Sequence, residues 1–282
     1  MYELRGNNKL NFGKCNILEY NGIHKSYFGG DQIFSTYKKF RKKLSPFTSK
    51  NKRNINMYCA GGTLGTARKP FIQTAFQKRT MMARPYTESL PGGSGYNLLK
   101  EKWASDFFKD IEKLALKFIY YGISYKYQRD KLLQSIFESK KTIPSDLRIC
   151  GTFFTQLSLV GDMTFESVGQ EITPHIDGDD IFTAIIHFGT PITGGNLQLF
   201  SGNSKTNIGS LVKTHKFLNG NIHMGCFTDV VHSVSRWTGV RGSFSLNLKK
   251  SMLNFFEDVN RRSYYKTYKQ LNYPQNDHYT VN

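Results

Sequence analysis

His175 and Asp177, near the middle of the chain, have the residue types and the spacing of metal ligands. They follow a stretch expected to form a β-strand, where residues two positions apart point to the same face. A neutral imidazole and a carboxylate on one face supply two of the three ligands of a facial triad. Such a triad leaves adjacent positions of an octahedral Fe(II) ion open for substrate and dioxygen. The pair therefore predicts a metal site, although chance also produces this short pattern.

The third ligand of such a triad has to be a histidine from a distant strand. His232 lies 55 residues after Asp177, inside the apolar run 230–234, and fits best because an Arg-x-Ser strand follows it. His215 and His223 are the alternatives. His187 lies in another apolar run and is interpreted as a buried core histidine.

Arg241 begins a segment in which polar and apolar side chains alternate, so one face of the expected strand is polar. Arg241 and Ser243 project together, and a guanidinium with a hydroxyl can bind one carboxylate. A buried arginine needs such an anion from a ligand or from the protein itself, and Asp229 is the alternative partner. Gly194 and Gly195 form a tight turn into a strand between the candidate ligands.

The elements that must position these residues follow from the spacing of apolar side chains. Apolar residues recur every three or four positions over 99–118 and predict a helix ending at Gly122. A second helix is expected over 130–139, with Leu133, Ile136 and Phe137 facing inward. Short runs rich in β-formers and separated by turns fill residues 151–250, a pattern typical of a jelly-roll sandwich or barrel.

These elements predict an α+β protein with a jelly-roll core, supporting helices and a basic N-terminal extension. We expect an irregular basic region over 1–97, packed on the core or extending from it. The unit over 98–282 is expected to hold the helical support, the catalytic core of about 151–250 and a C-terminal tail.

Charge is distributed unevenly along the 282 residues, which carry a formal net charge of +18. Residues 1–150 hold 28 basic and 11 acidic side chains, whereas 151–250 hold seven of each. This excess favours a polyanionic partner, with nucleic acid first, although a basic run can also be a localisation signal or a solvated face. The candidate nucleic-acid-binding residues are Lys38, Lys39, Arg41, Lys42, Lys43, Lys50, Lys52 and Arg53.

Composition excludes several classes of protein. With 39% hydrophobic and 14% aromatic residues, the chain is too apolar to be disordered. It has no apolar run long enough to span a membrane and no signal-peptide pattern at its start. The four cysteines are far apart, so we expect free thiols and an intracellular protein of the nucleus or cytoplasm, without membrane association.

The order of these features resembles that of the Fe(II)/2-oxoglutarate-dependent dioxygenases, over about residues 150–250. The resemblance implies a double-stranded β-helix core and oxidation of a substrate C–H bond, coupled to decarboxylation of 2-oxoglutarate to succinate. Gln156 is a further candidate for contact with the co-substrate. The resemblance also implies the site residues: Fe(II) ligands His175, Asp177 and His232, and Arg241 with Ser243 for the distal carboxylate of 2-oxoglutarate.

Three branches of this family differ in substrate. Segments 188–197 and 239–243 look like the strand and arginine motifs of the TET/JBP-like pyrimidine oxygenases of nucleic acids. The short interval of nine residues from His232 to Arg241 resembles the prolyl and other protein hydroxylases more closely. Small-molecule oxygenases have no evident use for a basic N-terminal half. We therefore predict oxidation of a 5-methylpyrimidine-like base, with DNA favoured over RNA; the alternatives are a prolyl-type protein hydroxylase and a non-catalytic nucleic-acid-binding jelly-roll module.

Overall fold

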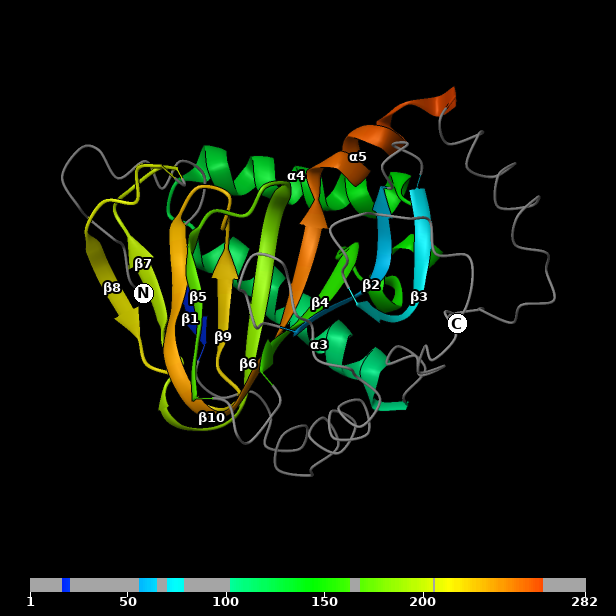
Figure 1. Ribbon diagram of the computed structural model, residues 1–282. Helices are drawn as coiled ribbons and strands as arrows, with labels where there is room; N and C mark the ends of the chain where they lie inside the picture. The colour runs from blue at the N-terminus through cyan, green and yellow to red at the C-terminus, as the bar shows by residue number, and fades with distance from the viewer. Residues whose placement is uncertain are drawn as a thin grey trace.

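The structure is a computed structural model, and it describes residues 17–20, 56–64, 70–78, 102–162, 168–204 and 206–260. Figure 1 shows a strongly curved sheet with helices α3 and α4 behind it. The elements are β1 (Leu18–Tyr20), β2 (Asn56–Leu64), β3 (Pro70–Lys78), α3 (Lys102–Gly122), α4 (Lys126–Thr142), η2 (Ser145–Leu147), η3 (Ile149–Gly151), β4 (Gln156–Asp162), β5 (Val168–His175), β6 (Asp180–Gly194), β7 (Leu197–Phe200), β8 (Leu211–His215), β9 (Ile222–Gly225), β10 (Val231–Lys249) and α5 (Lys250–Glu257).

The long strand β10 joins two halves of an antiparallel β-structure. Its first part pairs with β5 and β7, and β8 continues beyond β7. Its second part pairs with β4 and β6, and β9 continues beyond β6. The resulting orders, β5-β10-β7-β8 and β9-β6-β10-β4, are those of a double-stranded β-helix, so the predicted jelly-roll core is confirmed.

Polar and apolar residues alternate along β10, so its apolar face packs against the helical layer and its polar face lines the barrel interior. The ring of Phe244 packs at 6.4 Å from the rings of both Phe107 and Phe108 on α3, and at 5.0 Å from Phe188 on β6. Gly242 is required beside this cluster, because a Cβ there would lie 2.5 Å from the Phe188 ring. Since neighbouring residues of a strand face opposite sides, Arg241 and the polar positions after it face away from α3.

Helices α3 and α4 lie close to the ranges that the spacing of apolar residues predicts. One side chain of α4 faces a different way from the prediction. On α4, Leu132 and Ile136 are buried and Leu133 is partly buried, but Phe137 is 66% exposed. The prediction that Phe137 faces inward is therefore wrong. Leu133 and Phe137 are four residues apart and share a side of the helix, but only Leu133 packs against the core cluster.

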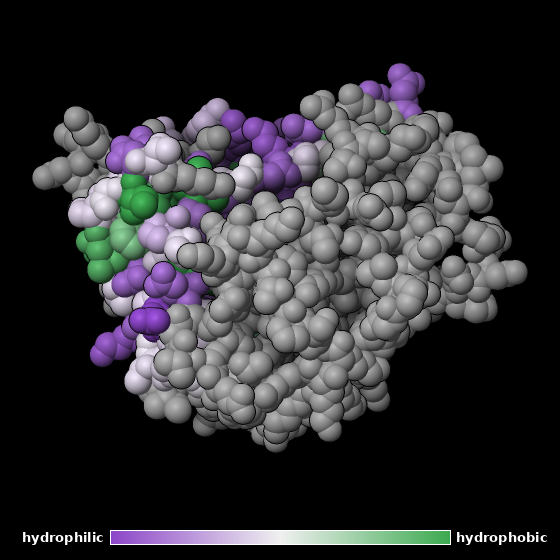
Figure 2. All heavy atoms as spheres, in the orientation of Figure 1, coloured by the Kyte–Doolittle hydropathy of each residue, from purple (hydrophilic) through white to green (hydrophobic). Residues whose placement is uncertain are grey.

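Other parts of the sequence form strands that apolar patterning did not reveal. Residues 1–97 were expected to be irregular, but β2 and β3 form a hairpin that extends the sheet beyond β4. The edge strand β8 was missed because its exposed face mixes Leu211 and Val212 with polar residues. Figure 2 shows apolar side chains gathered at this end of the molecule, where Leu218 is also exposed.

Two further expectations concern cysteines and membranes. Cys150 is a buried free thiol, but Cys226 is disulfide-bonded, so the expectation of free thiols throughout is wrong at Cys226. Among the described helices, none has the length and apolar character needed to cross a bilayer.

Candidate active site

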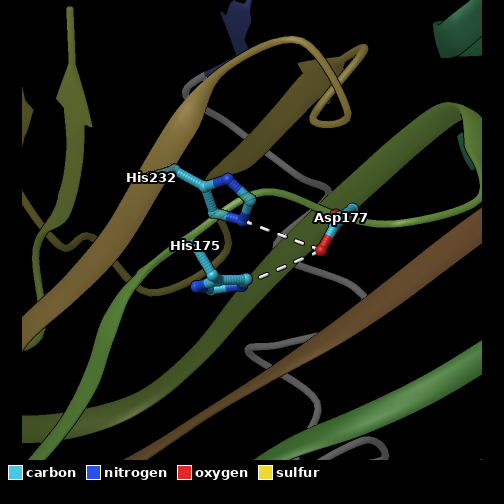
Figure 3. A group of neighbouring side chains, drawn as sticks. All are labelled: His175, Asp177 and His232. Carbon is cyan, nitrogen blue, oxygen red and sulfur yellow. Dashed lines mark ion pairs between the residues drawn. The ribbon is translucent and has the colours of Figure 1, made fainter. Parts of the chain in front are cut away.

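His175, Asp177 and His232 come together at one end of the barrel (Figure 3). His175 ends β5 and His232 lies near the start of β10, and the two residues are direct partners across the strand pair. The Nε2 atoms of His175 and His232 lie 3.8 and 3.9 Å from Oδ1 of Asp177. The three candidate ligand atoms all lie within 4.8 Å of one another, so one cation could contact all three.

Both imidazoles are held in the orientation that a metal ligand requires. Nδ1 of His175 lies 2.8 Å from the backbone oxygen of Thr173, and Nδ1 of His232 lies 3.0 Å from that of Val230. A carbonyl oxygen only accepts hydrogen bonds, so each Nδ1 carries a proton, and Nε2, which faces Asp177, is the ring nitrogen left to bind a metal. Burial, and then the neighbouring His175, lower the pKa of His232 to about 3. The donor set, two neutral imidazoles and a carboxylate, fits Fe(II).

The cluster of His175, Asp177 and His232 is exposed to solvent on one side only. The side chains of His175 and Asp177 are 29% and 24% exposed, whereas that of His232 is 5% exposed. The amide of Asp177 donates to the backbone oxygen of Phe227, and the Phe227 ring packs edge-on against His232 at 4.8 Å. The chain thus fixes the buried side of the cluster and leaves the other side open to ligands.

Arg241 is fully buried, and among the described residues no carboxylate forms a hydrogen bond or ion pair with it. Nε donates to the backbone oxygen of Gly195 at 3.0 Å, and Nη2 donates to Nδ1 of His187 at 3.1 Å. Nη1 has no hydrogen-bond partner among the described residues. The guanidinium carbon lies 5.2 Å from the Trp237 ring centre and 5.8 Å from that of Phe217. The alternative of an internal pair with Asp229 is not what the structure contains, because the groups that Arg241 contacts are neutral.

Nη1 of Arg241 is a buried donor that has no partner among the described residues. A buried guanidinium without a counter-ion is costly, and burial lowers the pKa of Arg241 to about 9. An anionic ligand at Nη1 would compensate this cost with a charge-assisted hydrogen bond. Ser243 is also buried and lies two residues further along the same face of β10. Both side chains are thus buried on one face of β10, and a role in binding the co-substrate stays a prediction.

The glycine turn before β7 leaves room for the side chain of Arg241. Gly195 has φ of +75°, and a Cβ there would lie 2.9 Å from Cδ of Arg241. We expect Gly195→Ala to lower stability by about 1–2 kcal/mol and to weaken 2-oxoglutarate binding by displacing the guanidinium. Thermal unfolding and co-substrate titration measure the two effects. Gly178→Ala is the matched control, because nothing lies within 4 Å of its Cβ position; an equal loss in both variants would contradict this reason.

The remaining candidate histidines lie around Arg241 and not at the triad. His187 is buried, as predicted, and its Nε2 lies 2.9 Å from Nδ1 of His223. The ring of His215 lies 4.6 Å from that of His223. Of the three histidines considered as the third ligand, the structure thus brings only His232 to His175 and Asp177. The contact between His187 and Arg241 was missed, and the sequence carries no signal for it.

The buried His187 makes stability depend on pH. Burial, and then His223, Arg241 and His215, lower its pKa well below 6.5. As pH falls below about 6.5, the unfolded imidazole gains a proton while the folded one does not, so stability is lost. We expect the stability difference between the parent and His187→Gln to shrink by up to ~2 kcal/mol between about pH 7 and pH 5. Denaturant unfolding at both pH values measures it, and a constant difference would contradict the buried neutral state.

The other residues considered in the sequence lie away from the histidine–aspartate–histidine cluster or outside the described residues. Asp179 accepts hydrogen bonds from Ser251 at the start of α5, and Asp180 pairs with Lys249 and accepts from Asn247. Burial raises the pKa of Asp180 to about 6. The candidate nucleic-acid-binding residues lie outside the described residues; they are Lys38, Lys39, Arg41, Lys42, Lys43, Lys50, Lys52 and Arg53.

Comparison with known proteins shows a shared fold at low sequence identity. No family model and no curated protein sequence matches the chain. The structure of NgTET1 in complex with 5mC DNA matches with a TM-score of 0.56 and 13% identity, over 90% of this chain and 80% of that one. A Pseudomonas putida prolyl-4-hydroxylase matches with a TM-score of 0.44 and 10% identity, over 86% and 97% of the two chains. A 2OG-Fe(II) oxygenase family oxidoreductase from Burkholderia pseudomallei matches with a TM-score of 0.42 and 12% identity, over 82% and 84%.

The topology and the likeness to NgTET1 define the class of fold. The chain has a double-stranded β-helix fold, and it shares this fold with the structure of NgTET1. Within that fold, the histidine–aspartate–histidine cluster and the buried Arg241 lie on the strands and loops described above.

Proposed function

We propose that this protein is an Fe(II)- and 2-oxoglutarate-dependent dioxygenase that oxidises a base of nucleic acid. The observation that carries the proposal is the pairing of a histidine–aspartate–histidine cluster with a buried, unsatisfied guanidinium in one double-stranded β-helix. A structural role would explain either feature alone. Both are needed together when a metal-chelated dicarboxylate has to be held at its two ends.

The proposed roles of the residues follow from their contacts. His175, Asp177 and His232 hold Fe(II), which when bound supplies the redox chemistry that couples decarboxylation of 2-oxoglutarate to oxidation of a C–H bond. Arg241, with Ser243, binds the far carboxylate of 2-oxoglutarate. Thr173 and Val230 keep the two imidazole lone pairs aimed at the metal through their backbone oxygens.

The interior face of the barrel supports a substrate that forms hydrogen bonds. Asn247 on β10 is the cross-strand partner of Gln156 on β4 and of Thr183 on β6, and all three are at least 94% buried. Oγ1 of Thr183 has no partner among the described residues. Asn247 is engaged with Asp180 and Ser245. The groups that could meet a substrate are therefore the Gln156 amide and the Thr183 hydroxyl, which suit the polar edge of a nucleobase better than the apolar ring of proline.

The charge of the chain supports the same substrate. An enzyme that acts on a base must hold the phosphate backbone and take the base out of the stack into an enclosed pocket. Residues 1–150 carry the basic excess, whereas the core residues 151–250 have equal numbers of acidic and basic side chains. A strongly basic region and a core of balanced charge within one chain suit these two functions. That NgTET1 was captured with 5mC DNA agrees with this choice of substrate class.

A succinate-release screen tests the proposal. The purified protein, with Fe(II), 2-oxoglutarate and dioxygen, is incubated with DNA containing 5-methylcytosine, unmodified DNA, RNA, and proline-containing peptides, and product masses are recorded. We expect succinate to rise with DNA containing the methylated base, and that base to gain one oxygen atom. Stimulation by the peptides alone, with an added oxygen on proline, would make the protein a prolyl hydroxylase. Nucleic-acid binding without succinate from any substrate would make it a non-catalytic module.

A further inference from the structure

A chain of buried imidazoles lies behind Arg241, on the side away from its unpartnered Nη1. Nη2 of Arg241 donates to Nδ1 of His187, and Nε2 of His187 lies 2.9 Å from Nδ1 of His223. His187 and His223 are 3% and 1% exposed. His187 lies on β6, which pairs with β10, and His223 lies on β9, which pairs with β6.

The hydrogen bonds of this chain can run in only one direction. A guanidinium has donors and no acceptor, so Nδ1 of His187 must be the unprotonated nitrogen. Its proton therefore lies on Nε2, which donates to Nδ1 of His223. His223 accepts the hydrogen bond of His187 in this tautomer and so stabilises it, and this tautomer is the only neutral form of His187 that can accept a hydrogen bond from Arg241.

The same contacts fix the direction of the guanidinium. Gly195 accepts from Nε and His187 accepts from Nη2, while Trp237 and Phe217 lie over the guanidinium. With Nε and Nη2 engaged, the group cannot rotate without losing hydrogen bonds in a buried place. Nη1 then remains as the donor directed at the co-substrate space.

We propose that His187, oriented by His223, is the positioning residue that makes Arg241 selective for a 2-oxo acid with a far carboxylate. The inference rests on the proposed function, since it assigns how that site chooses its co-substrate. A 2-oxo acid without the far carboxylate, such as pyruvate, still chelates the metal but makes no contact with Arg241. His187 therefore affects the binding of 2-oxoglutarate and leaves pyruvate unaffected.

Anaerobic titration of the Fe(II)-loaded full-length protein tests this, with the visible absorption of the Fe(II)–2-oxo acid chelate as the readout. We expect His187→Leu to weaken 2-oxoglutarate binding by about 10- to 100-fold and to change pyruvate binding less than about twofold. His187→Asn places an amide oxygen near the Nδ1 position and should restore 2-oxoglutarate binding to within about threefold. If the leucine variant does not fold, His187→Gln, whose amide reaches the Nε2 position instead, should show the same selective loss.

His215→Leu is the matched control, because it removes a buried histidine of the same cluster that does not contact Arg241. It should leave the preference for 2-oxoglutarate over pyruvate unchanged. An equal loss of both 2-oxo acids in His187→Leu, no loss of either, or the same selective loss in His215→Leu would overturn the inference. If the parent protein forms no chelate band with either 2-oxo acid, the proposed function itself fails and the inference fails with it.

Discussion

Replacing Asp177 with alanine will abolish Fe(II) binding and turnover of 2-oxoglutarate. Asp177 is the single carboxylate of the cluster, and its Oδ1 faces Nε2 of both histidines. Loss of a residue that only orients a metal ligand typically costs 10- to 100-fold in metal affinity, so loss of a ligand should cost more than about a hundredfold. Anaerobic metal titration and succinate release measure the two effects.

Asp179→Asn is the matched control for this variant. Asp179 lies in the same loop, but its carboxylate contacts Ser251 at the start of α5 and not the cluster. We expect this control to bind Fe(II) as the parent does. Retention of full Fe(II) affinity in Asp177→Ala would show that the three side chains do not form the metal site.

Replacing Arg241 with lysine will separate co-substrate binding from metal binding. Lysine keeps the positive charge but loses the planar fork that bonds Gly195 and His187 while presenting Nη1. We expect 2-oxoglutarate affinity to fall about a hundredfold, since hydrogen bonds to charged groups contribute about 1.5–3 kcal/mol each. Fe(II) affinity should not change, because Arg241 makes no contact with the cluster.

The control for this change lies on the same strand. Arg236 is an exposed arginine of β10, and Arg236→Lys should leave the affinities for Fe(II) and 2-oxoglutarate unchanged. Titration of the co-substrate into the metal-loaded variants measures the difference. Unaltered 2-oxoglutarate binding in Arg241→Lys, or a parallel loss of Fe(II), would argue against the assigned role.

Those parts of the candidate site whose residues lie close together in the sequence could be predicted. His175 and Asp177 are two residues apart on a strand end, so alternation alone places them together. Polar and apolar positions alternate after Arg241, and the structure indeed turns Phe244 to α3 and Arg241 to the interior. The distant His232 could be chosen only through the motif that follows it.

Some contacts could not be predicted because they depend on which residues pair across neighbouring strands. Others depend on how much of a helix surface its neighbours cover. The contact of His187 with Arg241 follows from the pairing of β6 with β10, which brings Ser243 opposite His187. Two expected strands merge into β10 because the segment between them keeps its pairing with β5 and β6. The exposure of Phe137 could not be predicted because helical periodicity gives the apolar side of a helix but does not show how far the neighbouring elements cover that side.

The reason for the Gly-Gly turn becomes clear only from the packing around it. The Gly-Gly turn was identified as punctuation before a strand. In the structure, Gly194 and Gly195 both have positive φ, and a Cβ on Gly195 would collide with the Arg241 side chain. The turn and the arginine, 46 residues apart, therefore act as one unit.

The most direct test of the central claim is the mass of the base after reaction. DNA containing 5-methylcytosine is incubated with the protein, Fe(II), 2-oxoglutarate and dioxygen, and the released nucleosides and succinate are quantified in the same sample. The account predicts that the methylated base gains one oxygen atom, with one succinate formed for each oxidised base and neither product in Asp177→Ala. Succinate formed without any change in the base, or an unchanged base and no succinate, would contradict it.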